Sequence, residues 1–122
     1  MKGYVDGFVL SVKKPLLNEY KKMATLAAKV WKKYGALEYF ECVGDDMNPK
    51  WVTLKFPKMA KTKKNEVTVF SFIVYKNKAH RNKVNALVMK DPLMSENNWK
   101  DKPMPFDMKR MAYGGFKTLV QR

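Results

Sequence analysis

The sequence has little cysteine, and it contains no long apolar run. Cys42 is the single cysteine among 122 residues, which excludes an internal disulfide framework and any metal site built from several cysteines. No stretch approaches the roughly 20 apolar residues of a membrane-spanning helix. The first ten residues are too short and too polar for a signal peptide. We therefore expect a cytoplasmic protein that has no membrane partner.

Other signatures are also missing. The sequence has no glycine-rich phosphate loop, no nucleophile elbow and no zinc-ligand spacing, and we expect no cofactor and no metal. Asp45 and Asp46 follow Gly44, but one acidic pair without further ligands is more typical of a turn than of a cation site.

Basic residues strongly outnumber acidic ones, yet arginine is scarce. The 25 Lys and Arg against 11 Asp and Glu give a formal net charge of +14, which is typical of proteins with anionic partners such as nucleic acid. Only three basic residues are arginine, the usual reader of base edges, so the composition argues against specific recognition. The best nucleic-acid candidate is residues 55–64, an expected exposed loop with one aromatic and five lysines: Lys55, Lys58, Lys61, Lys63 and Lys64.

Hydrophobic periodicity predicts four strands and two helices in one domain of residues 1–122. Pro15 opens the first helix and Gly35 ends it; its apolar residues recur every three or four positions. The second helix begins after Asn77 and ends before Pro92. The strands cover residues 3–12, 36–46, 66–75 and 109–120, with residues 51–56 as a short strand or extended segment. This order predicts an α+β, ferredoxin-like βαββαβ fold with an antiparallel sheet.

The predicted strands are apolar on both faces, whereas the helices of this arrangement cover only one face. The open face therefore needs a cover. Two such sheets packed face to face would bury it, and so we expect a homodimer.

Four segments spread over the whole chain resemble one known family. They are YVDGFV (residues 4–9), GALEYFECVGDD (35–46), TVFSFIVY (68–75) and MPFDMKRMAYGGF (104–116). In order and spacing they are similar to the YbaA-like family of bacterial proteins. The resemblance implies a ferredoxin-like fold of the dimeric α+β barrel type, and it leaves the activity open because no function is established for the family. Barrels of this type include cofactor-independent monooxygenases and ligand-sensing domains, but a fold does not settle function.

Asp6 is the first candidate for a functional residue. It shares a strand face with Tyr4 and Phe8, and a carboxylate on such a face must be paired or must have a raised pKa. Asp6 is either a general base or ligand anchor in a pocket, or a buried carboxylate neutralised by Arg110 or Lys109.

Other candidates surround the same predicted cavity. Glu41 shares a face with Tyr39, and Tyr113 precedes a glycine pair that either leaves room for a ligand or partner chain or lets the strand bend. Together the expected ligand-binding residues are Asp6, Tyr39, Glu41, Arg110 and Tyr113. The catalytic candidates are Asp6, Glu41 and His80, the only histidine, which is either a general acid or base or a packing residue. Cys42 is expected to be a buried small hydrophobe.

Three hypotheses about function follow. The first is a small-molecule site, with or without catalysis, in a dimeric barrel. The second is a nucleic-acid-binding module that uses the lysines of residues 55–64 and the lysine face of the first helix. The third is a structural or regulatory homodimer without a ligand.

Overall fold

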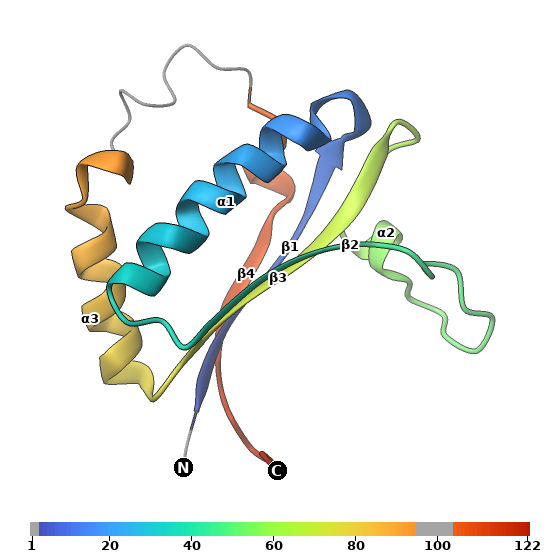
Figure 1. Cartoon of the computed structure of the whole chain (residues 1–122). Helices are drawn as coiled ribbons and strands as arrows, with labels where there is room; N and C mark the ends of the chain where they lie inside the picture. The colour runs from blue at the N-terminus through green and yellow to red at the C-terminus, as the bar shows by residue number, and fades with distance from the viewer. Residues whose placement is uncertain (1–2, 95–103) are drawn as a thin grey trace.

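The structure is a computed structural model that describes residues 3–94 and 104–122. Four antiparallel strands form one sheet in the order β2-β3-β1-β4, and two long helices lie on one face of it (Figure 1). The predicted order of strands and helices is confirmed, and with it the α+β, ferredoxin-like architecture. The bounds are Tyr4–Lys13 (β1), Leu17–Lys33 (α1), Glu38–Val43 (β2), Phe56–Met59 (α2), Glu66–Tyr75 (β3), Lys78–Met89 (α3) and Ala112–Lys117 (β4).

The two central strands supply much of the core. β1 and β3 pair over ten residues, from Tyr4 opposite Tyr75 to Lys13 opposite Glu66. Both are rich in β-branched and aromatic residues, which suit a pleated, buried surface. Since successive side chains alternate between the faces, one set points toward the helices and is buried there: Tyr4, Leu10, Val12, Val69, Ile73 and Tyr75.

The helix ends follow local signals. Pro15 lies in a 3-10 turn, Lys14–Leu16, so that α1 begins two residues later than predicted. Gly35 has a φ of 112°, and the predicted left-handed C-terminal cap is confirmed. The predicted cap of α3 is also confirmed, because the side chain of Asn77 accepts a hydrogen bond from the backbone N–H of His80 at 2.8 Å.

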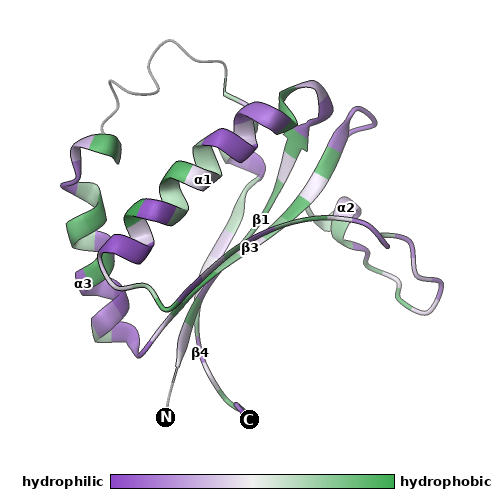
Figure 2. Ribbon diagram, viewed as in Figure 1, coloured by the Kyte–Doolittle hydropathy of each residue, from purple (hydrophilic) through white to green (hydrophobic). Residues whose placement is uncertain are grey.

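The sheet face opposite α1 and α3, which we call the open face, carries large apolar side chains. Phe40, Phe70 and Phe116 are 45%, 45% and 62% exposed. Phe40 stacks on Phe72 across β2 and β3, with ring centroids 4.7 Å apart. Figure 2 shows hydrophobic residues along both β1 and β3. The expectation that strands are apolar on both faces is confirmed for these two central strands.

Residues 44–65 fold back over one end of the open face, where α2 lies (Figure 1). The Ser11 hydroxyl donates to the carbonyl of Ala60 at 3.2 Å, and the ring of Phe56 packs against Phe70 at 6.3 Å. The prediction of a loop over residues 55–64 was wrong for Phe56–Met59, which form α2, while the other residues of this stretch form no helix or strand. No strand forms at residues 51–56.

Both edge strands are shorter than predicted. β4 begins at Ala112 because Met108–Arg110 form a 3-10 turn, which Asp107 caps by accepting from the backbone N–H of Lys109 at 2.9 Å. β2 ends at Val43. The prediction that Cys42 is buried was wrong: it is exposed, because alternation along this edge strand places it on the open face.

Candidate functional site

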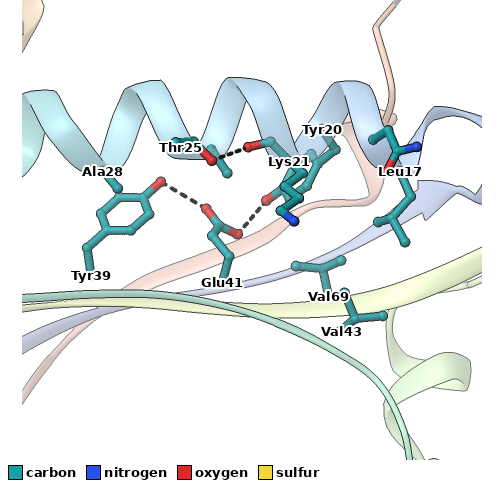
Figure 3. Close-up of a pocket in the computed structure, with 11 residues that line it drawn as sticks. Leu17, Tyr20, Lys21, Thr25, Ala28, Tyr39, Glu41, Val43 and Val69 are labelled. Atoms are coloured by element: carbon teal, nitrogen blue, oxygen red, sulfur yellow. Dashed lines mark hydrogen bonds between the residues drawn. The ribbon is translucent and has the colours of Figure 1, made fainter.

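A cavity of about 550 Å³ lies between α1 and β2, and we call it the α1–β2 pocket (Figure 3). Its wall is largely apolar, with Glu41 as the only acidic residue that lines it. The apolar face of α1 and the face of β2 that points toward the helices meet at this pocket. The apolar residues of α1 recur every three or four positions and therefore share one face of the helix, and every second side chain of β2 points toward that face. The lining residues are Leu17, Asn18, Tyr20, Lys21, Ala24, Thr25, Ala28, Tyr39, Glu41, Val43 and Val69.

The polar centre of this pocket is Glu41, held between two phenols. The Tyr20 hydroxyl on α1 donates to Glu41 Oε1 at 2.6 Å, and the Tyr39 hydroxyl on β2 donates to Glu41 Oε2 at 2.8 Å. Figure 3 shows Tyr39 and Glu41 directed from β2 toward α1. Burial, followed by the charge of Glu41, raises the pKa of both tyrosines, so both phenols keep their protons and remain donors.

Asp6 belongs to a second polar centre, between the sheet and α3. It is 2% exposed, and its Oδ1 lies 3.4 Å from Nε of Arg81. The prediction that Arg110 or Lys109 neutralises Asp6 was wrong, because Arg81 takes this position. Burial raises the pKa of Asp6, and the charge of Arg81 offsets the shift in part. Hydrogen-bonding groups of Tyr113 and Asn85 also act on Asp6 and lower its pKa.

Asp6 and Arg81 form an ion pair without a hydrogen bond between the two facing atoms. Within the part of the chain that the structure describes, neither Asp6 Oδ1 nor Arg81 Nε has a hydrogen-bond partner. The guanidinium is instead fixed by Tyr4. Arg81 Nη2 donates to the Tyr4 hydroxyl at 2.9 Å, and the guanidinium carbon lies 5.0 Å from the centre of the Tyr4 ring. The centre is therefore a tightly packed ionic contact between α3 and β1.

The second glycine of the β4 pair is explained by this contact. A Cβ atom on Gly115 would overlap the Tyr4 hydroxyl and would lie 2.8 Å from Arg81 Nη2. A Cβ atom on Gly114 would meet only Phe116, at 3.5 Å or more. Gly115 thus makes room for two side chains of the same protomer.

The remaining predicted residues lie elsewhere. Arg110 donates to both carboxylate oxygens of Glu66, at 2.7 and 2.8 Å, and to the carbonyl of Lys61. This pairing lowers the pKa of Glu66 to about 2. His80 Nδ1 accepts from the backbone N–H of Lys76 at 3.0 Å, so the ring is engaged at the start of α3.

The structure therefore divides the five predicted ligand-binding residues among three places. Tyr39 and Glu41 share the α1–β2 pocket, Tyr113 accompanies Asp6, and Arg110 pairs with Glu66. Sequence reasoning assigned no site role to Tyr20 or Arg81. Tyr20 was visible as a hydroxyl-bearing residue within the apolar stripe of α1, whereas no sequence signal joined Arg81 to Asp6.

The lysines of the nucleic-acid hypothesis lie on and around α2. Lys58, Lys61, Lys63 and Lys64 are exposed, while Lys55 is half-buried and donates to the carbonyl of Val52. The only aromatic residue among them packs against the sheet rather than forming a platform for bases.

No group of three His, Cys, Asp or Glu suited to a metal ion occurs within residues 3–94 and 104–122. None of the helices in those two ranges is long and apolar enough to cross a membrane.

Comparison with known proteins agrees with the architecture. A family described as a protein of unknown function (DUF1428) matches residues 3–108. The chain belongs to this family. Two curated relatives of this chain are the Uncharacterized protein YbaA of Escherichia coli K12 and its counterpart in Shigella flexneri. Each is 42% identical over 117 residues, which are 96% of this chain and 97% of the relative.

Solved structures similar to this DUF1428 chain share its fold at low identity. One, from Bacillus cereus, is provisionally assigned as an antibiotic biosynthesis monooxygenase; it has a TM-score of 0.58, 10% identity, and coverage of 100% of this chain and 98% of that one. Another is a dimeric ferredoxin-like protein from an uncultured marine organism, with a TM-score of 0.56, 11% identity and full coverage of both chains. These likenesses concern the fold alone.

Proposed function

We propose that this member of the DUF1428 family is a homodimer that binds a small molecule in the α1–β2 pocket. The observation that carries the proposal is Glu41, an acid fixed by Tyr20 and Tyr39 beside a largely apolar cavity of about 550 Å³. Ligand sites are typically concave and apolar, with a few placed polar groups that orient the ligand. A cavity of this volume lies within the usual range of small-molecule sites.

The open face supports the dimer. Phe40, Phe70 and Phe116 expose about half of their surface in the isolated chain, and apolar patches of this kind mark interaction sites. A second copy of the chain supplies an equivalent face, which two-fold symmetry makes self-complementary. The fold neighbour described as dimeric is consistent with this arrangement.

The pocket is tested by filling it. A fragment library is screened against the wild type by thermal shift and ligand-observed NMR, and each hit is then titrated against Ala28→Leu. This change adds three carbons to the pocket wall, while Ala86→Leu adds the same carbons to an exposed position on α3. A ligand at a hundredfold its Kd stabilises the wild type by about 2.7 kcal/mol.

We expect Ala28→Leu to abolish this stabilisation and Ala86→Leu to retain it. Hits that bind Ala28→Leu as well as they bind the wild type, or a wild type that binds no fragment, would refute the pocket.

The dimer is tested by sedimentation. We expect the wild type to sediment as a dimer and Phe70→Asp as a monomer, because a carboxylate would be buried without a partner between the sheets. Met89→Asp places the same charge on α3, at a residue 67% exposed and outside the open face, and should remain a dimer. A monomeric wild type would refute the proposal.

A further inference from the structure

The polar centre of the α1–β2 pocket, formed by Glu41, Tyr20 and Tyr39, has only acceptors left to offer, while the lining also includes the donor-bearing side chains of Asn18 and Lys21. Each oxygen of Glu41 already receives one phenol hydrogen, from Tyr20 and Tyr39. A phenol has a single hydrogen to donate, so both tyrosines have used theirs and retain only oxygen lone pairs. A carboxylate oxygen has two acceptor positions, and Glu41 therefore also keeps free lone pairs.

The acceptors of this polar centre define the chemistry of the group that a ligand places beside Glu41. We propose that the α1–β2 pocket takes a primary amine, bound as its ammonium ion beside Glu41 with its apolar body against α1. This inference rests on the proposed function and names its ligand class. An ammonium group has three N–H donors and no acceptor, which matches the oxygens of Glu41, Tyr20 and Tyr39.

Other polar groups match these acceptors less well. A carboxylate or phosphate would bring further acceptors against Glu41, and like charges repel in such a site. A neutral hydroxyl offers one hydrogen and no charge. An ammonium forms charge-assisted hydrogen bonds, which are about twice as strong as neutral ones.

The rest of the wall sets the body of the ligand. Leu17, Ala24, Ala28, Val43 and Val69 line the cavity and offer no polar atom from their side chains. An aliphatic or aromatic hydrocarbon group fits this surface, since each buried methylene contributes about 0.8 kcal/mol of transfer free energy in general.

Lys21 lines the same pocket, and its ammonium group could compete with a bound amine for Glu41. Its ammonium forms no ion pair with Glu41 in the described part of the chain, where the only lysine–glutamate pair is Lys22 with Glu19. Lys21 nevertheless repels an incoming cation. The net charge of +14 acts in the same direction over a longer range and is screened by salt. Amine binding should therefore strengthen when Lys21 is neutralised and when the salt concentration rises.

The experiment uses three probes with one apolar body: benzylamine, benzyl alcohol and benzoate, titrated into the full-length protein at pH 7 by ligand-observed NMR. We expect benzylamine to bind about tenfold more tightly than benzyl alcohol, a difference of about 1.4 kcal/mol, and benzoate to bind most weakly. Glu41→Gln should remove the preference for the amine. Lys21→Met should increase benzylamine affinity severalfold, and it changes an exposed residue that the fold does not need.

The outcomes separate this inference from the proposed function. Equal binding of benzylamine and benzyl alcohol, or benzylamine affinity that falls in Lys21→Met, would refute the amine class even if Glu41→Gln failed to fold. Suppose that none of the three probes binds, but that other fragments bind the wild type and not Ala28→Leu. The amine class is then wrong, and the proposed small-molecule pocket is supported. If no compound binds, both fail.

Discussion

Gly115→Ala tests whether the second glycine of β4 exists to admit Tyr4 and Arg81. Gly35 is the only glycine with a positive φ within residues 3–94 and 104–122, so neither Gly114 nor Gly115 needs glycine for its backbone conformation. The cost of a methyl group at either position is therefore steric. At Gly115 the new carbon would overlap the Tyr4 hydroxyl and would lie 2.8 Å from Arg81 Nη2.

The expected magnitude follows from the rigidity of these neighbours. Tyr4 is 8% exposed, and Arg81 is bonded to it, so neither side chain can move away without losing contacts. Overpacking of this kind costs about 1–3 kcal/mol, which corresponds to a fall of roughly 4–12 °C in Tm for a domain of this size. Gly114→Ala meets only Phe116 at ordinary contact distance and should change stability by less than about 1 kcal/mol.

Urea denaturation of both variants measures the difference. The measurements are made at one protein concentration, because dimer stability depends on concentration. Gly114 lies on the open face, where a methyl group could also disturb the dimer. Both glycine substitutions are therefore measured again in the Phe70→Asp background, which is expected to be monomeric. Tyr4→Phe removes the overlapping hydroxyl, so Gly115→Ala should cost less in that background, with a coupling energy of about 1 kcal/mol. Equal losses in Gly114→Ala and Gly115→Ala, or no coupling to Tyr4, would refute the steric explanation.

Three further outcomes are expected. Glu66→Gln should lower the free energy of unfolding by about 3 kcal/mol at pH 7, because it leaves Arg110 poorly paired. Pairing lowers the pKa of Glu66 from 4.5 to about 2, so the stabilisation by Glu66 is complete above pH 4.5 and is lost as the pH falls toward 2. Urea midpoints of the wild type should show this loss, and those of Glu66→Gln should not. Burial raises the pKa of Asp6 above 3.8. The free energy of unfolding of the wild type, measured relative to Asp6→Asn, should therefore be highest below pH 3.8 and should decrease as the pH rises through the raised pKa. An increase over this range would contradict the raised pKa. Cys42 should react with a maleimide more slowly in the wild type than in Phe70→Asp, and equal rates would argue against a dimer that covers the open face.

Several elements could be predicted from local signals. The apolar stripe of α1, its glycine cap and the Asn77 cap of α3 depend on residues within a few positions of one another. β1 and β3 were equally clear, because their β-branched and aromatic residues fit no other element. The short elements were not predictable in this way. The 3-10 turn at Met108–Arg110 depends on its Asp107 cap, which competes with the strand pattern nearby. α2 has no side-chain cap, and its surroundings contact distant strands through Phe56 with Phe70 and Ala60 with Ser11.

The candidate site was predictable only in part. Alternation along β2 places Tyr39 and Glu41 on one face, and this pair was identified from the sequence. The donor from Tyr20 depends on how α1 packs over β2, since these residues are 21 positions apart. The same holds for the choice of Arg81 over Arg110 as the partner of Asp6, because both arginines were available and no local rule distinguishes them.

The sequence by itself therefore determined the class of fold, the order of its elements and the apolar character of both sheet faces, because these follow from periodicity and from residues close in the chain. The tertiary structure decided which charges pair, why Gly115 is a glycine and where a ligand-sized cavity lies. Those features depend on the approach of side chains from separate elements to within a few ångströms, and a pattern along one strand or helix does not contain that information.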